Sequence, residues 1–390
     1  MTASSGASES FTGRRVCVAG AGVAGASAAR VLRELGAEVV VADAGTHNDR
    51  DLPAGVDLVV TSPGWRPTQP LLVAAAAAGV PLWGDVELAY RLRPEGQPWL
   101  GVTGTNGKTT TVQLLESVLR AAGYRAIACG NVGLPVLDAV LDPDPYDVLA
   151  VEVSSFQLHW SSTVEFHAAA VLNLAPDHLD WHGSFEAYAR AKASIWRGEP
   201  YCIYNADDPV VTALAQRRHP RQGFTLGPAT DDLFGVVGDA LVDPRGAELA
   251  RTSDVEPPAP HNVANALAAA ALARTLPAVT PASVRDGLRA FRPGAHRIAT
   301  VATIGGVTYV DDSKATNPHA AAASLAAYDS VVWIAGGLAK GAAFDALVQQ
   351  CASRIRAVVL LGADRDVIAD ALARHAPQIP TVTVERTDTG

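Results

Sequence analysis

The chain has 390 residues, 48% of them hydrophobic and 18% charged, which is enough apolar material for two or three packed domains and excludes a mainly disordered chain. The net charge of −9 argues against non-specific nucleic-acid binding, which needs a broad basic face, but a few local Lys and Arg suffice for anionic small ligands. The four cysteines form no CxxC pair, so we expect neither a disulfide scaffold nor a zinc site. The N-terminus has no apolar signal-peptide segment, and no apolar stretch reaches the roughly 20 residues of a membrane span. We therefore expect a cytoplasmic protein that is not membrane-integral.

Strand-like and helical runs alternate along the whole chain, which is typical of α/β proteins with mostly parallel sheets. A first series ends in a linker at residues 93–98 and has predicted strands at residues 15–19, 38–42 and 57–61. A second series has predicted strands at residues 99–103, 147–153, 168–174 and 201–205. After a break near residues 292–294, the third series has predicted strands at residues 307–312, 331–335, 357–361 and 381–386. We predict three domains, at residues 1–98, 99–293 and 294–390.

The third series ends on a predicted strand, four residues before Gly390. Parallel sheets are normally covered by helices on both faces. We therefore expect the C-terminal domain of this chain to be incomplete.

Residues 101–110 read GVTGTNGKTT and lie between a predicted strand and a predicted helix. Glycines allow backbone N–H groups to turn around phosphate oxygens, the helix N-terminus adds its dipole, Lys108 adds a positive charge, and the Thr109 hydroxyl can bind Mg²⁺. The strict phosphate-loop spacing needs a glycine at position 102, where this chain has Val102. The strand–loop–helix context still favours nucleotide phosphate binding over a simple Gly- and Thr-rich turn.

Two further residues are candidates for a metal site. Glu152 ends a predicted strand, so its carboxylate is expected at the sheet edge where ligands bind, in reach of Mg²⁺ beside a phosphate loop. Lys192 lies on the apolar stripe of a predicted helix capped by Ser184. Burial would lower its pKa and leave a neutral amine that can take up CO₂ as a carbamate, an anion suited to Mg²⁺. The alternative is a lysine whose stem packs while its ammonium group reaches water.

Residues 20–25 fit G-x-G-x-x-G between a predicted strand and a predicted helix, and Asp43 ends the next strand, as in a dinucleotide-binding site. Taken alone, this pattern indicates a dehydrogenase. Two nucleotide-type loops in one chain are better explained by two different phosphorylated ligands. Further along the chain, Asn262 and Asn265 share a predicted helix face, and the two alternatives are that one of them caps the helix or that both together present amides to a ligand.

In chain order these motifs resemble those of the Mur ligases, the ATP-dependent amide ligases of peptidoglycan synthesis. The resemblance rests on GTNGKTT at 104–110, EVSSFQL at 152–158, DHLDWH at 177–182 with Lys192, HNVAN at 261–265, His296-Arg297, DSKATN at 312–317 and the Gly-rich segment 336–341. EVSSFQL and DHLDWH are particularly similar to the D-glutamate-adding branch. The resemblance implies a Rossmann-like N-terminal domain, a central P-loop ATPase-type domain with a parallel sheet, and a Rossmann-like C-terminal domain.

The resemblance also implies roles for individual residues. ATP would be bound by Gly104, Thr105, Asn106, Gly107, Lys108, Thr109, Thr110, Asn262, Asn265, Arg297 and Asp312. The UDP-sugar substrate would be bound by Gly20, Gly22, Val23, Ala24, Asp43, Gly130, Asn131, Ser154 and Gln157, with Asp43 reading uracil. D-glutamate would face Lys314, Thr316 and Lys340. The implied catalytic residues are Lys108, Glu152, His178 and Lys192; Thr109 and Glu152 would bind one Mg²⁺, and His178 and carbamylated Lys192 a second.

The implied reaction joins D-glutamate to UDP-N-acetylmuramoyl-L-alanine (UDP-MurNAc-L-Ala) through an acyl phosphate, with ATP and two Mg²⁺. An acyl phosphate hydrolyses in open water, so the third domain should close over the site. We expect these small molecules as partners, and a monomer. Another Mur ligase, a folylpolyglutamate-type ligase and a truncated, non-catalytic nucleotide-binding form are the alternatives. We expect residues 1–390 to bind UDP-MurNAc-L-Ala with little ligase activity.

Overall fold

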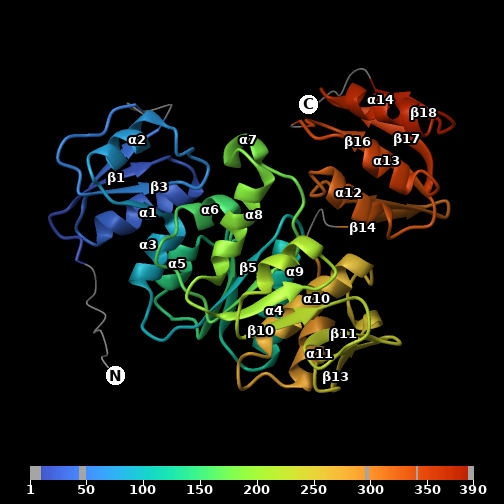
Figure 1. Cartoon of the computed structure of the whole chain (residues 1–390), viewed down its shortest axis with the longest axis horizontal. Coiled ribbons are helices and arrows are strands. Elements are labelled where there is room, and N and C mark those ends of the chain that lie inside the picture. The colour runs from blue at the N-terminus through green and yellow to red at the C-terminus, as the bar shows by residue number, and fades with distance from the viewer. Residues whose placement is uncertain (1–9, 44–49, 295–297, 340, 385–390) are drawn as a thin grey trace. The chain divides into compact units, whose positions relative to one another are not determined.

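The computed structural model describes residues 10–43, 50–294, 298–339 and 341–384. It has the α/β fold that the alternating pattern predicts, and it divides into two compact units (Figure 1). The first unit contains Met1–Pro258 with Asn262–Phe291, and the second contains Ala259–His261 with Arg292–Gly390. The predicted boundaries after residues 98 and 293 stay predictions.

The N-terminal sheet has four parallel strands in the order β2-β1-β3-β4. These strands are β1 (Arg15–Ala19), β2 (Glu38–Ala42), β3 (Leu58–Thr61) and β4 (Leu82–Gly84), and they alternate with α1 (Val23–Glu34), α2 (Pro70–Ala77) and α3 (Asp85–Leu92). The three predicted strands lie where the sequence places them. Parallel strands joined by helices form a Rossmann-like layer whose ligands bind at the carboxyl ends of the strands.

The central sheet has nine strands, in the order β13-β12-β11-β10-β9-β8-β5-β7-β6. The strands from β6 to β11 in that order are parallel, whereas β12 and β13 add an antiparallel edge. Their bounds are β5 (Trp99–Thr103), β6 (Ala126–Gly130), β7 (Val148–Glu152), β8 (Ala168–Val171), β9 (Tyr201–Asn205), β10 (Arg221–Phe224), β11 (Leu233–Val237), β12 (Ala240–Val242) and β13 (Glu248–Arg251). The buried strand β5 lies between β8 and β7, so the loop that follows it is at the middle of the parallel part.

Helices cover both faces of this sheet. One face packs against α4 (Lys108–Ala121), the Ala-rich α10 (Pro260–Ala273) and α11 (Pro281–Ala290) in a single apolar cluster. The other face carries α5 (Val136–Val140), α6 (Ser155–His159), α7 (Leu179–His182) and α8 (Phe185–Ala193), and α9 (Pro209–Ala215) follows β9. A second cluster runs without interruption from the core of the N-terminal sheet through α3, α5 and α8 to this face. The first unit is therefore held together by a shared hydrophobic core.

The second unit contains a parallel sheet in the order β16-β17-β18, formed by β16 (Val331–Gly336), β17 (Ile355–Leu361) and β18 (Thr381–Thr383). Its helices are α12 (Pro318–Leu325), α13 (Asp345–Cys351) and α14 (Arg365–His375). The strand predicted at residues 307–312 is present, but its predicted place in the third β/α series is wrong. That strand, β15 (Val307–Asp311), instead pairs antiparallel with β14 (Ala299–Ile304) as a separate two-stranded ribbon, because only two residues separate the two strands. Among the described residues, none of the helices combines the length and the apolar character that crossing a membrane requires.

Candidate active site

The loop between β5 and α4 has the backbone of a phosphate-binding loop. Gly104 and Gly107 have positive φ angles of 158° and 83°, and Gly107 is the N-cap of α4. The loop is braced by Asn173, whose side chain accepts from the Asn106 N–H at 2.8 Å and donates to the Asn106 carbonyl oxygen at 3.1 Å. The Thr105 side chain is also held, by a hydrogen bond of 3.0 Å between its hydroxyl and the Tyr188 hydroxyl. Lys108, Thr109 and Thr110 then form the first turn of α4, where helix N–H groups lack partners within the helix.

Lys108 extends back over this loop. Its Nζ donates to the carbonyl oxygens of Gly104 at 3.0 Å and of Thr105 at 2.9 Å, and the residue is half-buried. The positive charge is thus placed at the mouth of the loop, at the start of a helix whose dipole also favours anions.

Glu152 joins the first turn of α4 to the end of β7. Its Oε2 accepts a hydrogen bond of 2.8 Å from Thr109 Oγ1, and its Oε1 accepts one of 2.9 Å from Asn131 Nδ2. Glu152 is 2% exposed, so both carboxylate oxygens are fixed by these donors. A hydroxyl and a buried carboxylate are hard oxygen ligands of the kind that Mg²⁺ prefers, so this pair fits a magnesium ion.

Lys192 is buried on α8, with 2% of its surface exposed. Its Nζ donates to the Gly104 carbonyl oxygen at 2.8 Å and lies 3.4 Å from Thr103 Oγ1. Burial lowers the pKa of Lys192 well below its usual range, and the positive charge of Lys108 lowers it further. The inward-facing lysine is confirmed, and the alternative of an ammonium group that reaches water is wrong.

The ring of His178 packs against the ring of Phe156, which lies on α6. His178 has a positive φ of 52°, precedes α7, and its ring centroid is 4.8 Å from that of Phe156 on α6. Burial lowers the pKa of His178, against the charge of Asp177, whose Oδ2 lies 3.6 Å from His178 Nε2. A neutral imidazole is the form that binds metal ions. The DHLDWH motif at residues 177–182 includes the helix α7.

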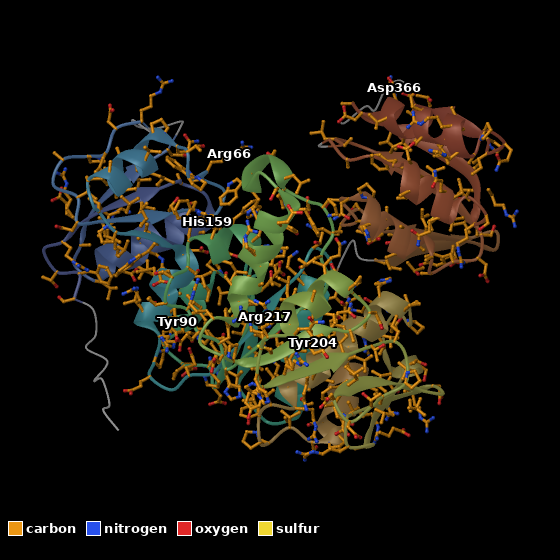
Figure 2. All side chains as sticks on the ribbon, in the orientation of Figure 1. Arg66, Tyr90, His159, Tyr204, Arg217 and Asp366 are labelled. Atoms are coloured by element: carbon orange, nitrogen blue, oxygen red, sulfur yellow. The ribbon has the colours of Figure 1, made fainter. Side chains whose placement is uncertain are left out.

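A contact between the two sheets of the first unit reaches the same segment. Arg66, in the loop after β3, pairs with Asp180 of α7 at 2.5 Å between Nη2 and Oδ2, and its Nη1 donates to the Asp180 carbonyl oxygen at 3.2 Å. Figure 2 shows Arg66 on the part of the N-terminal layer that faces α7. Asp180 belongs to the DHLDWH motif, whereas no sequence motif includes Arg66.

Of the two asparagines of α10, Asn265 lies against the phosphate loop, and Asn262 contacts Asn265. Both are buried, and Asn265 Nδ2 donates to Asn262 Oδ1 at 3.3 Å. A Cβ atom added at Gly107 would lie 2.4 Å from Asn265 Oδ1, so the amide and the loop are in close approach. The structure therefore brings together residues that are about 160 positions apart in the sequence.

The predicted UDP-sugar residues fall into two groups. In the N-terminal sheet, Gly20 follows β1 with a φ of 103°, Gly22 is the N-cap of α1, and Val23 and Ala24 form its first turn. Asp43 directly follows β2 and is half-buried. These positions are those of a Rossmann phosphate-binding turn.

The second group lies at the end of the central sheet. Gly130 has a φ of 109°, and a Cβ atom there would lie 2.3 Å from the Glu152 carbonyl oxygen, so only glycine fits. Asn131 contacts Glu152 as described above. Ser154 and Gln157 form a capping box at the start of α6, and Gln157 Nε2 donates to Asp85 Oδ2 at 2.9 Å. The polar atoms of Ser154 and Gln157 are thus already engaged within the protein.

The remaining predicted residues belong to the second unit. Asp312 accepts from the Ile298 N–H at 3.2 Å and from the Ser324 hydroxyl, whereas Lys314 and Thr316 are exposed. Arg297 and Lys340 lie outside the described residues.

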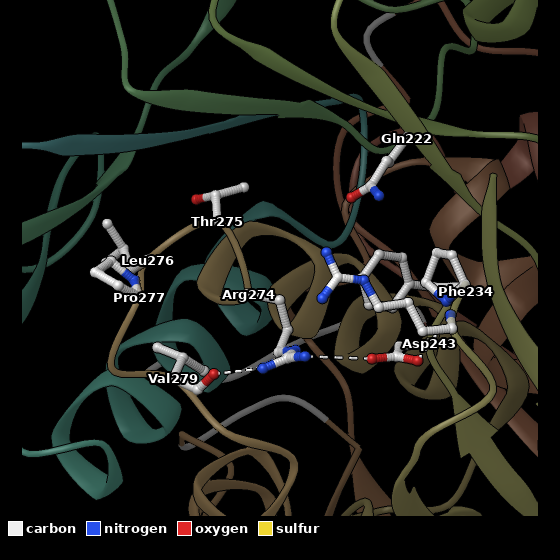
Figure 3. A pocket seen from close by; sticks show the side chains of 10 residues that line it. Gln222, Phe234, Asp243, Arg274, Thr275, Leu276, Pro277 and Val279 are labelled. Atoms are coloured by element: carbon white, nitrogen blue, oxygen red, sulfur yellow. Dashed lines mark hydrogen bonds and ion pairs between the residues drawn. The ribbon is translucent and has the colours of Figure 1, made fainter. Parts of the chain in front are cut away.

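Two further features of the described ranges concern metal binding and a cavity. In those ranges, His, Cys, Asp and Glu side chains form no cluster of three or more that could hold a metal ion, so a magnesium ion here would depend on Thr109 and Glu152 together with ligand and water oxygens. A cavity of about 310 Å³ lies at the far end of α10, where Arg274 pairs with Asp243 at 3.4 Å (Figure 3). It is lined by none of the predicted site residues.

Comparison with known proteins agrees with this geometry. The Mur ligase middle domain model matches residues 102–273, the model of the Mur ligase, glutamate ligase domain matches residues 296–389, and residues 1–69 match the alanine dehydrogenase/PNT, C-terminal domain. The UDP-N-acetylmuramoylalanine–D-glutamate ligase of Streptomyces avermitilis is 56% identical over 97% of this chain and 89% of its own length. The enzyme of that name from Thermobifida fusca is 59% identical over 97% of this chain and 88% of its own.

Among solved structures, the UDP-N-acetylmuramate-alanine ligase of Thermotoga maritima superposes with a TM-score of 0.62 at 21% identity, over 96% of this chain and 90% of that one. At this identity the likeness supports the fold alone. The two matched domains and the high identity along almost the whole chain agree with the phosphate loop that the structure contains. The chain belongs to the Mur ligase family of ATP-dependent ligases.

Proposed function

We propose that this chain forms the amide bond between D-glutamate and the L-alanine carboxylate of UDP-MurNAc-L-Ala, with ATP hydrolysis, in peptidoglycan precursor synthesis. The observation that carries the proposal is the convergence of Lys108, the Thr109–Glu152 pair and buried Lys192 on the loop after β5. The relatives named above, at 56–59% identity, support D-glutamate as the amine that is added.

The proposed mechanism has two steps. The L-alanine carboxylate attacks the γ-phosphate of ATP, the bond to the β-phosphate breaks, and an acyl phosphate forms. The amine of D-glutamate then attacks the acyl carbon, and inorganic phosphate leaves. Lys108 and the first-turn N–H groups of α4 hold the triphosphate in line and stabilise the charge that develops on its oxygens.

Thr109 and Glu152 are the residues proposed to hold one Mg²⁺, and His178 with a carbamate on Lys192 a second. When bound, magnesium offsets the negative charge of the phosphoryl oxygens. Two of the proposed ligands are already oriented by neighbouring side chains. Asn131 orients the Glu152 carboxylate, and Phe156 orients the His178 ring. Fixing ligands in this way is how surrounding residues tune a metal site.

The carbamate is proposed because burial lowers the pKa of Lys192 and so favours its uncharged amine. The uncharged amine nitrogen attacks CO₂ and releases one proton, which leaves an N-carboxylate in place of the amine. Lys192→Ala is expected to lose activity and to regain part of it when a short carboxylic acid is added, because the acid supplies the missing carboxylate. If Lys192→Ala stays fully active without such an acid, the carbamate has no role.

The positions of the substrates are part of the proposal, and the fold is compatible with them. We propose that Gly20, Gly22, Val23, Ala24 and Asp43 bind the UDP portion, with Gly130, Asn131, Ser154 and Gln157 toward the sugar and the alanine. Asn262, Asn265, Arg297 and Asp312 are proposed to contact ATP, and Lys314, Thr316 and Lys340 to face D-glutamate. We further propose that the protein acts as a monomer in the cytoplasm, where such soluble precursors would be met.

Phosphate release is the direct test. With UDP-MurNAc-L-Ala and ATP, D-glutamate is expected to stimulate release, even where the rate is low, and L-alanine and L-glutamate are not; stimulation by L-glutamate but not by D-glutamate would favour a folylpolyglutamate-type ligase. The match of residues 1–69 to a dehydrogenase domain favours one other possibility, nicotinamide dinucleotide binding at residues 20–25. NADH fluorescence on addition of the protein tests it, and no change is expected.

A further inference from the structure

The junction between β4 and α3 holds α6 at several points. Gly84 donates its N–H to the Trp160 carbonyl oxygen at 3.0 Å, and a Cβ atom at Gly84 would lie 2.9 Å from Trp160 Cβ, so the two backbones are in close approach. Asp85 accepts from Gln157 Nε2 at 2.9 Å. Gln157 in turn accepts from the Ser154 N–H at 3.0 Å, which fixes the first residue of the turn.

The same junction also holds the chain just after α6. The Glu87 carboxylate accepts from the N–H groups of Ser162 at 2.7 Å and Thr163 at 2.9 Å and from the Thr163 hydroxyl at 2.6 Å. It also pairs with Arg91 Nε at 2.8 Å, and its side chain is fully buried. We call Gly84, Asp85 and Glu87 the α3 clamp.

A helix as short as α6 depends on such contacts. It has five residues, and an isolated helix of that length is not stable in water. Its position is therefore set by the groups that hold its two ends. Those groups come from the N-terminal sheet, whereas α6 belongs to the central sheet.

The helix in turn positions both halves of the candidate metal site. Glu152 ends β7 only three residues before α6 begins. Phe156 of α6 contacts the His178 ring at 4.8 Å, and Ser155 Oγ lies 2.9 Å from His182 Nε2. A shift of α6 would therefore move the end of β7 and the Phe156 ring that packs against His178 together.

Stability alone does not explain the carboxyl group of Asp85. The residue is 6% exposed, and its Oδ1 has no hydrogen-bond partner of good geometry among the described residues. Burial raises the pKa of Asp85, against the hydrogen bond from Gln157 and weaker contributions from the Val86 and Asp85 N–H groups, which lower it. A buried and half-satisfied polar group is less stabilising than an apolar residue of the same shape. An apolar residue at position 85 could not accept the hydrogen bond from Gln157 Nε2.

We propose that Asp85 is a positioning residue: through Gln157 and α6 it sets the relative placement of Glu152 and His178, and so links the proposed UDP-sugar layer to the magnesium site. The proposal rests on the proposed function for its consequence in catalysis, and on the contacts above for its structural part. It assigns a role to residues 84–87, which none of the motifs includes.

The test compares three variants. Asp85→Ala removes the acceptor, Asp85→Asn retains one carbonyl oxygen for Gln157 Nε2, and Asp138→Asn is the matched control. Asp138 also links the two sheets through an acid, but it lies on α5, and it accepts from two residues of α1, Arg30 Nη2 at 2.6 Å and Ser27 Oγ at 2.5 Å. If Asp85→Ala does not fold, Gln157→Met breaks the same contact from the other side and replaces it in the exchange and Mn²⁺ readouts only, because Gln157 is also proposed to face the substrate.

The first readout needs no activity. In the metal-free protein, Asp85→Ala is expected to speed amide hydrogen exchange at residues 155–160 and 178–182 by roughly tenfold, whereas Asp138→Asn leaves these segments unchanged. Titration with Mn²⁺ and ATP, followed by electron paramagnetic resonance, is expected to show binding weakened about 10-fold in Asp85→Ala and restored in Asp85→Asn.

The second readout is turnover. Asp85→Ala is expected to raise the Mg²⁺ concentration at half-maximal rate and to lower kcat, with KM for D-glutamate unchanged. The proposal is overturned if Asp85→Ala and Asp138→Asn behave alike in exchange and Mn²⁺ binding, or if Asp85→Asn does not restore them. If the wild-type chain releases no D-glutamate-dependent phosphate, the proposed function fails, while exchange and Mn²⁺ binding still decide the role of Asp85.

Discussion

Thr109 Oγ1 donates a hydrogen bond of 2.8 Å to Glu152 Oε2 and thereby joins the first turn of α4 to the carboxyl end of β7. The two residues are 43 positions apart, and both are buried. This contact places a hydroxyl and a carboxylate side by side at the mouth of the phosphate loop, where a magnesium–triphosphate complex would bind.

Removing the hydroxyl is expected to weaken magnesium binding without unfolding the protein. Thr109→Val keeps the shape of the side chain but removes one proposed ligand and one donor to Glu152, so the Mg²⁺ requirement should rise by about 10- to 100-fold. Thr111→Val is the matched control, because the Thr111 hydroxyl only bonds back to the Gly107 carbonyl oxygen at 2.9 Å, a contact of little value to a helix. Phosphate release is measured as a function of Mg²⁺ concentration for both variants. The same Mg²⁺ dependence in Thr109→Val and Thr111→Val would contradict the proposal that Thr109 binds magnesium.

Lys192 should make the protein less stable at neutral pH than a neutral residue would. Its pKa in the folded state is well below the value of 10.5 in the unfolded chain, so between these values the unfolded state binds more protons, and stability rises with pH. Lys192→Met is therefore expected to have the higher Tm at pH 7 in bicarbonate-free buffer, with the difference narrowing toward pH 10. A lower Tm for Lys192→Met across this range would mean that the amine is charged and well paired.

Glu87 should contribute stability that is lost in acid. Burial opposes its ionisation, but hydrogen bonds from Thr163 and Ser162 and the contact with Arg91 prevail, and the pKa of Glu87 is lowered below 4.5. Its contribution is present above pH 4.5 and is lost as the pH falls through the lowered value. Glu87→Gln is expected to cost about 1–3 kcal/mol at pH 7 in urea unfolding, because buried donors lose an ionised acceptor. A cost that does not shrink in acid would point to lost packing instead.

Gly107 should tolerate no side chain, for two separate reasons. Its φ of 83° strains any other residue, and a Cβ atom would lie 2.4 Å from Asn265 Oδ1. Gly123 has a similar φ of 89°, but nothing lies within 4 Å of an added Cβ atom, so it isolates the strain alone. Gly123→Ala is expected to cost about 1 kcal/mol with normal ATP binding, whereas Gly107→Ala should also lose ATP affinity. The idea of a close approach fails if calorimetry finds equal affinities.

Much of this architecture could be predicted from the sequence, because the strands that form the parallel core are short, apolar and followed by glycines or polar residues. Residues 15–19 and 99–103 are examples in which the prediction and the strand agree. Short edge strands such as β12 and β13, and the antiparallel pairing of β14 with β15, could not be predicted, since three or four residues carry too little periodicity and pairing depends on partners far away.

The sequence predicted those site residues whose type is unusual for their position, such as Lys108 directly after a glycine-rich loop and Lys192 on the apolar stripe of a helix. Asn173, Asp85 and Arg66 were missed because their partners Asn106, Gln157 and Asp180 are distant in sequence. The sequence does contain one indication of Asn173, because it is a polar amide near the end of the apolar strand predicted at residues 168–174. Acids such as Asp85 at the start of a helix are ordinary caps in a sequence, and only the fold reveals that this one is buried.

The most direct test of the account is binding of ATP with magnesium to the loop after β5, measured by isothermal titration calorimetry on the wild-type chain and on Lys108→Met. The account predicts saturable binding to the wild type and a loss of affinity of at least about tenfold in the variant, since one charge-assisted contact to phosphate is worth more than about 1.4 kcal/mol. Equal affinity in the two proteins, or no binding to the wild type, would contradict it.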